Sequence, residues 1–389
     1  MVLANMPGYS ETFIRSLIEQ LTKAGHEVIL FTDGAENERI EGCEVICGYS
    51  KRNPVGGALF ILSSLILTIV TKPKVLFKFF GLEKSLGISY SALFKRYVKN
   101  AHILRYSCDK LHFTFSTLML GRENVALAKG IQSSISMRGF DMYVFPVKNP
   151  GCYNQLFKSI DKVHSISQNL VDTARQHGLS ESVPVSVIPP AVNNTLLDKK
   201  SLAASEDLKD QVLNIVTVGR AHWMKGGEDM LHGLQELMQS GVPFTFKWIG
   251  DGPDMERLQF AAKQLGLGDR AKFLGKLSHK QTTEEVAASD VYLQYSYKEG
   301  FCNAVLEAQA LAKLCIVSNG GALSENVLDG ETGWVLKERT PSSLAKKIAE
   351  LTKMSKVELE GLRKNAHVRV AEDFNLEKQR AEFIKFFES

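Results

Sequence analysis

The chain has 389 residues, of which 44% are hydrophobic and 23% charged, and its formal net charge is +4. This length exceeds the ~250 to 300 residues at which a single hydrophobic core usually stops growing, so two domains are expected. The composition argues against a disordered protein, and the small charge, without a basic face interleaved with aromatics, argues against a nucleic-acid binder.

The opening of the chain reads as a strand, a helix and a second strand. An apolar run at 2–4 is followed by a helical pattern over 10–24 and by another apolar run at 28–31. Ser10 is placed to cap this helix and Gly25 to end it. The stretch MVLANMPGYSETF lacks the charged, apolar and small-residue regions of a secretory signal, so a cytoplasmic location is expected.

Residues 54–100 hold long apolar and aromatic runs without clean alternation, which indicates several helices. The most apolar stretch, 55–70, is shorter than the ~20 residues that span a bilayer. Basic residues accompany these runs: Lys72, Lys74, Lys78, Lys84, Lys95, Arg96 and Lys99. Segment 54–99 could therefore make a peripheral contact with an anionic membrane, and the alternative, slightly favoured, is a core helix with a solvated face.

Strand-like runs recur along the rest of the chain, and helical patterns separate most of them. In the first half these runs lie at 111–115, 133–137, 162–166 and 185–188, and in the second half at 213–218, 244–249, 271–274, 291–295 and 314–317. This alternation predicts an α/β protein with parallel sheets covered by helices. After Pro341 the pattern is helical through Ser389.

A polar stretch at 193–211 lies between the two series of strands. We therefore expect a doubly wound domain at 1–192, a second one at 193–372, and a C-terminal helix at 373–389 that packs back on the first domain. The six cysteines show no C-x-x-C pair and no metal-ligand spacing with histidine, which fits a reducing compartment and predicts no metal site.

The second series opens with a strand that leads directly into Gly219-Arg220-Ala221-His222-Trp223-Met224-Lys225-Gly226-Gly227 and a helix. In a doubly wound sheet this turn lies at the carboxyl edge, where ligands bind. A diphosphate there would gain two cations, Arg220 and Lys225, and free backbone N–H groups. The alternative, an ordinary charged surface turn, is equally consistent with these residues alone.

Two carboxylates follow the strand at 291–295. Asn303 is a natural N-cap, which leaves Glu299 in the loop before a helix and places Glu307 about one turn inside it. Carboxylates accept hydrogen bonds from the vicinal hydroxyls of a ribose or a hexose, and the helix N-terminus can hold phosphate. The alternative is a pair of acids that meet only solvent.

These motifs, with IGDGP at 249–253, FLGKLS at 273–278 and SNGGALSENVLDGETGWVL at 318–336, resemble the retaining glycosyltransferases of family 4. Those enzymes have a GT-B fold, in which two Rossmann-like domains face a cleft. The first half resembles the family more weakly, through PGYSETFI at 7–14, GHEV at 25–28, DKLHFTF at 109–115, SMRGFD at 136–141 and PPAV at 189–192.

The resemblance implies a nucleotide-sugar donor held mainly by the second domain, without a metal or other cofactor. Arg220 and Lys225 would contact the diphosphate, and Glu307 the ribose. Glu299 would contact the donor sugar. The remaining donor-binding residues implied are Gly300, Phe301, Asn303, Leu277 near the base, and Gly250 of the IGDGP turn.

Two positions depart from the family pattern. Many relatives carry a Gly-Gly pair where this chain has Pro7-Gly8-Tyr9-Ser10, so phosphate contact from this loop is not implied, and Ser10 is assigned to the acceptor or sugar side. Many also carry a histidine where this chain has Arg138. Arg138 could offset charge on the leaving diphosphate or orient the sugar, but it cannot act as a base.

For Arg138, Asp141 and His112, a purely structural role is the alternative to a role in the site. Arg138 and Asp141 could form a structural pair instead, and Asp141 is otherwise assigned to the acceptor or sugar side. His112 is assigned to the same side, with a core histidine as the alternative.

The function expected from the sequence is retaining transfer of a hexose-type sugar to a saccharide or lipid-linked saccharide acceptor, in cell-surface polysaccharide synthesis. The alternatives are a nucleotide-sugar epimerase or hydrolase of GT-B fold, and a catalytically silent binding protein that holds the donor for a partner transferase. A dehydrogenase is disfavoured because no G-x-G-x-x-G follows a first strand.

Overall fold

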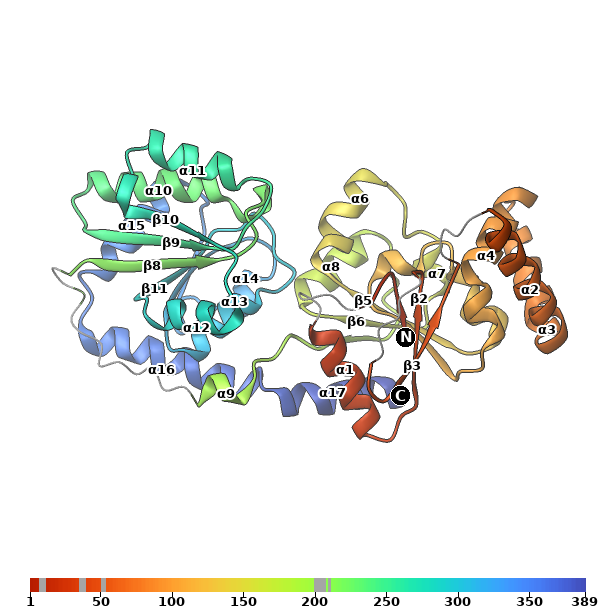
Figure 1. The fold of residues 1–389 in the computed structure, drawn as a ribbon. Helices are drawn as coiled ribbons and strands as arrows, with labels where there is room; N and C mark the ends of the chain where they lie inside the picture. The colour runs from red at the N-terminus through yellow and green to blue at the C-terminus, as the bar shows by residue number, and fades with distance from the viewer. Residues whose placement is uncertain (7–11, 35–39, 50–53, 199–207, 209–210) are drawn as a thin grey trace. The chain divides into compact units, whose positions relative to one another are not determined.

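The computed structural model describes residues 1–6, 12–34, 40–49, 54–198, 208 and 211–389. They form two compact units (Figure 1). The first unit comprises Met1–Ile166, Leu170–Ile188 and Arg380–Ser389, and the second comprises Ser167–Asn169 and Pro189–Gln379.

The first unit is built on a seven-stranded sheet in the order β3-β2-β1-β4-β5-β6-β7, in which all pairs are parallel. Its strands are β1 (Val2–Leu3), β2 (Val28–Thr32), β3 (Cys43–Cys47), β4 (Lys110–Phe113), β5 (Gln132–Met137), β6 (Lys162–Ser165) and β7 (Val185–Val187). The order reverses direction between β1 and β4, as in doubly wound folds. The sequence did not predict β3.

The helices of this unit are α1 (Thr12–Lys23), α2 (Pro54–Thr71), α3 (Pro73–Ser85), α4 (Tyr90–Arg105), α5 (Glu123–Lys129), α6 (Phe145–Lys148), α7 (Leu156–Ser159) and α8 (Gln168–Gln176), whose first two residues belong to the second unit. Short turns at Ser116–Met119 and Phe140–Val144 complete the unit. Gly25 follows α1 with φ of +91°, a conformation that glycine adopts without steric cost, so it ends the helix as predicted. The predicted cap Ser10 lies outside the described residues.

The second unit is built on a six-stranded parallel sheet in the order β10-β9-β8-β11-β12-β13. Its strands are β8 (Leu213–Val218), β9 (Phe244–Ile249), β10 (Ala271–Gly275), β11 (Val291–Gln294), β12 (Leu314–Ser318) and β13 (Trp334–Leu336). The direction of winding reverses between β8 and β11. The sequence predicted five of these strands and missed β13.

The helices of the second unit are α9 (Asn194–Leu197), α10 (Gly227–Gln239), α11 (Met255–Gln264), α12 (His279–Ala287), α13 (Asn303–Ala310), α14 (Leu323–Asn326), α15 (Pro341–Leu351), α16 (Lys356–Asp373) and the start of α17 (Leu376–Glu388). Helices α10 and α15 cover one face of the sheet, and α13 and α16 the other (Figure 1). Each face has its own buried cluster, one around Trp248 and Leu234 and the other around Val305 and Val317. Both faces are therefore dry, as a parallel sheet requires.

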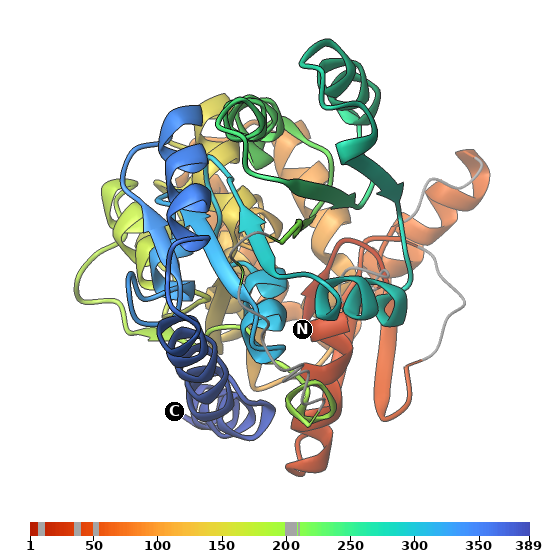
Figure 2. The ribbon, with the colours of Figure 1, turned by 90° about the vertical axis from the view of Figure 1, so that its left-hand side faces the viewer.

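The end of the chain returns to the first unit. Helix α17, dark blue in Figures 1 and 2, begins in the second unit and from Arg380 onward belongs to the first. There Phe383 and Phe386 are buried in the same cluster as Leu3, Ile14 and Ile18. Burying two phenylalanine side chains contributes roughly 3 to 6 kcal/mol of apolar transfer energy, enough to hold this segment on the unit.

Candidate functional site

Glycines stand at the carboxyl ends of β8, β9 and β10, where the backbone segments lie close together. The Gly219 amide donates to the Ile249 carbonyl at 2.9 Å, and the Gly250 amide donates to the Gly275 carbonyl at 2.8 Å. At Gly250, φ is +131°, and a Cβ atom would lie 2.1 Å from the Gly219 oxygen. Only glycine fits there, so the three strand ends leave an unobstructed edge for a ligand.

The loop after β8 is fixed at both ends. The Ala221 amide donates to the Asp251 carbonyl at 3.1 Å, and Met224 accepts from the Tyr297 amide at 2.7 Å. Gly226 ends the loop with φ of +63°, where a Cβ atom would lie 2.3 Å from the carbonyl oxygen of Tyr295. These contacts lock the course of the loop that carries the predicted diphosphate ligands Arg220 and Lys225, and Arg220 is exposed.

Lys225 and Glu299, predicted separately from two motifs, are in direct contact. The Lys225 Nζ lies 2.5 Å from Glu299 Oε1, and the two side chains are only 22% and 14% exposed. Burial disfavours the ammonium, but the charge of Glu299 and its hydrogen bond outweigh this and raise the pKa of Lys225. Lys225 therefore stays cationic, as a diphosphate ligand must.

Glu299 is held by the sheet itself. Its Oε1 also accepts from Ser296 Oγ at 2.7 Å and from Gln294 Nε2 at 3.2 Å, and Gln294 in turn accepts from the Tyr292 hydroxyl at 2.9 Å. The backbone of Glu299 bonds to Gly320 and Ala322. The carboxylate is thus oriented before any ligand arrives, which lowers the reorganisation that binding would require.

The start of α13 differs from the prediction. Asn303 is not the N-cap: the N-cap is Cys302, and Asn303 is the first helical residue. The Cys302 amide donates to Asn326 Oδ1 at 3.0 Å, and Asn326 Nδ2 donates to the Cys302 carbonyl at 3.2 Å, so a distant side chain replaces the local cap. Asn303 is exposed at the helix start, where it remains a predicted donor-binding residue.

The other predicted donor residues lie around this helix. Gly300 is buried, and the half-buried ring of Phe301 packs 5.6 Å from the Phe374 ring, centroid to centroid. Glu307, one turn into α13, lies with its Oε1 3.3 Å from His279 Nε2 at the start of α12. Leu277 is half buried in the turn between β10 and α12. The structure therefore gathers these residues on the carboxyl side of the second sheet.

In the first unit, Arg138 and Asp141 follow β5 but do not pair through their side chains as the structural alternative assumed. The Asp141 carboxylate accepts from the Arg138 backbone amide at 3.1 Å and from the Thr117 hydroxyl at 3.1 Å. The Arg138 guanidinium instead lies over the Phe13 ring, 4.1 Å from its centroid, and its Nε has no hydrogen-bond partner among the described residues. The Asp141 carboxylate is held by its neighbours, whereas the Arg138 Nε remains without a partner in the described part of the chain.

Burial shifts both of these groups. It raises the pKa of Asp141 to about 6, although the hydrogen bonds from Thr117, Ser116 and Arg138 act in the opposite direction. It also lowers the pKa of Arg138 to about 10, so Arg138 remains charged at neutral pH and cannot serve as a base.

His112 lies in the interior of the first unit. Its Nδ1 is 2.8 Å from Ser134 Oγ and its Nε2 is 3.1 Å from Ser136 Oγ, and its ring lies 5.1 Å from that of Phe387. Burial lowers its pKa well below the ordinary value, so the ring is neutral. Ser10 lies outside the described residues.

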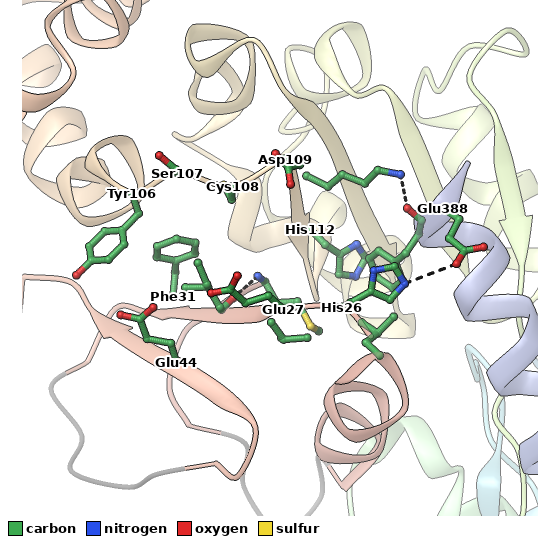
Figure 3. Close-up of a pocket in the computed structure, with 16 residues that line it drawn as sticks. His26, Glu27, Phe31, Glu44, Tyr106, Ser107, Cys108, Asp109, His112 and Glu388 are labelled. Atoms are coloured by element: carbon green, nitrogen blue, oxygen red, sulfur yellow. Dashed lines mark hydrogen bonds and ion pairs between the residues drawn. The ribbon is translucent and has the colours of Figure 1, made fainter. Parts of the chain in front are cut away.

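A pocket of about 750 Å³ lies at the opposite edge of the first sheet, beside the amino ends of β1, β2 and β4 (Figure 3). The Met1 amine donates there to the Ile29 carbonyl at 2.6 Å, and burial lowers its pKa to about 6. His26 and Glu388 face each other at 3.9 Å (Figure 3). Among the predicted site residues that the structure describes, only His112 lines this pocket. Because parallel sheets bind ligands at their carboxyl ends, we do not assign it to the donor.

Residues 198–368 match the family described as Glycosyl transferases group 1. The chain contains a group 1 glycosyltransferase domain. It is 24% identical over 347 residues to a subunit of the phosphatidylinositol N-acetylglucosaminyltransferase of Arabidopsis thaliana, covering 88% of this chain and 70% of the relative. It is 26% identical over 230 residues to a putative colanic acid biosynthesis glycosyltransferase of Salmonella typhimurium, covering 57% of this chain and about half, 55%, of the relative.

The fold of the chain is GT-B. A structure of an Anabaena protein solved in complex with UDP and glucose superposes with a TM-score of 0.69 at 14% identity, covering 100% of this chain and 98% of the other. The predicted architecture of two Rossmann-like sheets is thereby confirmed. At this identity the likeness concerns the fold alone.

Three contributors to the site of the glycosyltransferase domain were missed by sequence reasoning. Gln294 and Ser296 orient Glu299, and His279 contacts Glu307. Two of them leave a signal, since polar residues alternate at the end of an otherwise apolar strand, where a sheet edge is expected. His279 leaves none, because it comes from a helix start 28 residues before Glu307.

Proposed function

We propose that this protein is a retaining glycosyltransferase that moves a hexose-type sugar from a nucleotide-sugar to a saccharide or lipid-linked saccharide acceptor. The contact between Lys225 and Glu299, 2.5 Å apart at the carboxyl edge of the second sheet, carries the proposal. It joins a cation suited to a diphosphate to an acid suited to sugar hydroxyls. Exposed Arg220 lies in the same loop as Lys225.

In the proposed reaction the bond between the anomeric carbon and the diphosphate breaks, and the leaving diphosphate gains negative charge. Lys225 and Arg220 would stabilise that charge in the transition state. The acceptor oxygen would bond to the anomeric carbon from the same face, and its proton would pass to the leaving diphosphate. Glu299 would hold the sugar through its hydroxyls, and Arg138 would offset charge on the diphosphate.

UDP is the donor nucleotide that we favour, because the Anabaena protein of the same fold was solved with it. A lipid-linked or polysaccharide acceptor fits the names of the Arabidopsis and Salmonella relatives. We also propose a cytoplasmic, metal-independent enzyme that makes a peripheral membrane contact through residues 54–99.

Calorimetric titration with UDP, GDP and ADP tests the donor site, in the protein and in the Glu307→Ala variant. We expect micromolar binding of UDP that the substitution weakens, since Glu307 is assigned to the ribose. Absence of binding by all three nucleotides would contradict the assigned donor site. Glu285→Ala is the matched control, because Glu285 is a half-exposed acid of α12 that pairs with Lys247 instead.

Product analysis separates the transferase from its enzymatic alternatives. With a UDP-hexose and an acceptor, NMR should detect a new glycoside with the anomeric configuration of the donor. An inverted linkage would refute retention, and a free sugar or an epimerised nucleotide-sugar formed in the presence of acceptor would favour the hydrolase or epimerase.

A further inference from the structure

Helix α2 of the first unit carries an apolar stripe that faces away from the protein. Its buried positions include Ser64 and Thr68, which are 2% and 0% exposed. Its outward positions include Leu62, Ile66 and Val70, which are 55%, 52% and 73% exposed. A surface helix of a globular protein normally directs its apolar stripe to the core. Here Ser64 and Thr68 face the protein, and a stripe of apolar side chains faces outward.

Hydrogen bonds fix this orientation. Thr68 Oγ1 donates to the Ser64 carbonyl at 2.7 Å and accepts from the Tyr97 hydroxyl of α4 at 3.1 Å. Tyr97 is fully buried. Rotating α2 to bury its apolar stripe would leave the Tyr97 hydroxyl without this partner inside the unit, which is costly. The outward apolar stripe is therefore a stable feature of the fold.

The apolar surface extends beyond α2. Half of the large hydrophobic side chains that are exposed in the described part of the chain, ten of twenty, lie within residues 59–94. They are Leu59, Leu62, Ile66, Leu67, Ile69, Val70, Phe77, Leu86, Tyr90 and Phe94. Helices α2 and α3 lie at the periphery of the first unit (Figure 1). A concentration of this kind marks a surface that binds something apolar.

The exposed charges within residues 59–99 are all positive. Exposed lysines stand at Lys74, Lys78, Lys84, Lys95 and Lys99. The single acid within residues 59–99, Glu83, is 0% exposed and receives hydrogen bonds from Arg96 at 2.7 Å and Asn124 at 3.1 Å. The exposed surface thus combines apolar side chains with unopposed cations, which is the composition that binds an anionic lipid surface.

We propose that residues 59–99 form a docking surface for an anionic lipid bilayer, with the outer stripe of α2 and Phe77 entering the interface and the lysines contacting headgroups. No helix in the described part of the chain is long and apolar enough to cross a membrane, so the contact lies on one leaflet. A second copy of the chain fits less well, because face-to-face pairing would bring the lysines together.

This inference deepens the proposed function, since docking would place the transferase beside a lipid-linked acceptor. It does not need sugar transfer to be tested. Flotation with vesicles of phosphatidylcholine alone, and with about a third phosphatidylglycerol, measures binding directly. We expect the protein to float with the anionic vesicles and to be released at ~1 M salt, where screening removes most of the lysine attraction.

Matched substitutions locate the surface. The triple variant Leu62→Gln, Ile66→Gln, Val70→Gln should lower vesicle binding at least about tenfold, because its apolar insertion is lost. The control triple Val147→Gln, Val212→Gln, Val357→Gln changes valines that are 77%, 53% and 78% exposed elsewhere, and should leave binding unchanged.

A charge variant provides the second measurement if the triple variant folds poorly. Lys74→Glu, Lys78→Glu should lower binding to anionic vesicles at least about tenfold, and Lys353→Glu, Lys364→Glu should not.

UDP titration of the same preparations separates the two proposals. UDP binding without vesicle binding overturns the docking surface and leaves the transferase proposal intact. Vesicle binding without UDP binding supports the docking surface and contradicts the transferase proposal. Equal binding to neutral and anionic vesicles, or a dimer in analytical ultracentrifugation that only the α2 variant disrupts and that does not float, would also overturn the docking proposal.

Discussion

The carboxyl edges of the two sheets use their polar groups differently. In the second unit, Lys225 is bonded to Glu299 and Glu307 lies against His279, so polar groups that can meet a ligand already face one another. In the first unit, the Asp141 carboxylate is occupied by amides and a hydroxyl of its own framework, and Arg138 lies on the Phe13 ring.

The difference explains why ligand-binding residues can be predicted from the sequence in the second unit but not in the first. Carboxylates and cations that are bonded to each other can exchange these partners for sugar hydroxyls and phosphate at little cost. A buried carboxylate that holds backbone amides in place cannot leave them without loss of structure. The two units therefore have similar folds, but the polar groups at their carboxyl edges are arranged differently.

The largest expected effect is that of Lys225→Ala on sugar transfer. Removing one preorganised charge partner of a developing anion commonly lowers turnover by about 10² to 10³. The fold should persist, because Ser296 and Gln294 still donate to Glu299. Steady-state kinetics with a UDP-hexose measures the effect.

Lys247→Ala is the control for this prediction. Lys247 pairs with Glu285 at 2.6 Å on the same sheet, so an ion pair of the same type is lost outside the site. Turnover reduced equally by both substitutions would mean that Lys225 has only a structural role, and the contrast between the two edges would fail.

A second prediction concerns stability and the Asp141 carboxyl. Because burial raises its pKa from the ordinary 3.8 to about 6, the folded protein binds more protons than the unfolded chain between these values. Its contribution to stability is therefore fully present below about pH 4 and is lost as pH rises through 6, by roughly 3 kcal/mol.

Asp141→Asn removes this titration. Urea unfolding of the protein and the variant at pH 4 and pH 7 should show the difference in stability between them changing by that amount, with the variant gaining relative to the protein at pH 7. Parallel stability curves would show that the hydrogen bonds from Thr117, Ser116 and Arg138 keep the carboxylate ionised despite its burial.

Sequence patterns predicted the second sheet well because parallel strands are buried on both faces and read as continuous apolar runs. The two strands they missed, β3 and β13, are edge strands of their sheets. β3 has one fully buried residue among five, and β13 has only three residues, so neither produces a long apolar run. Ser10, which the sequence assigned to the acceptor or sugar side, lies outside the described residues.

The sequence predicted which residues belong to the candidate site, but it did not predict which of them contact one another. Arg220, Lys225, Glu299 and Glu307 all came from motifs, but the Lys225–Glu299 pair joins positions 74 residues apart, which spacing cannot reveal. The Asn303 cap was wrong for a related reason. A local rule selected the residue, whereas the amide of Cys302 bonds to Asn326, 24 residues away.

A smaller effect is expected for Glu307→Gln. The amide keeps the size of the side chain but loses the charge that strengthens hydrogen bonds from ribose hydroxyls, so UDP affinity should fall by about 10-fold. Calorimetry measures it, with Glu285→Gln as the matched control. If affinity is unchanged while turnover falls, Glu307 acts on the reaction and not on the nucleotide.

The smallest effect is expected for His279, which would position Glu307 from outside the ligand. Its ring is 67% exposed and lies 3.3 Å from the carboxylate, and contacts of this exposure are worth under about 1 kcal/mol. His279→Ala should therefore raise the KM for the donor by no more than about fivefold and leave kcat unchanged, since the chemistry at Lys225 and Glu299 is untouched.

Two further variants test whether His279 acts through Glu307. His279→Gln, which can still donate to Glu307, should restore part of the loss. In the double variant His279→Ala, Glu307→Ala the two effects should be less than additive, because the contact between the two side chains is already lost in either single variant. Full additivity would instead mean that His279 contacts the donor itself and does not act through Glu307.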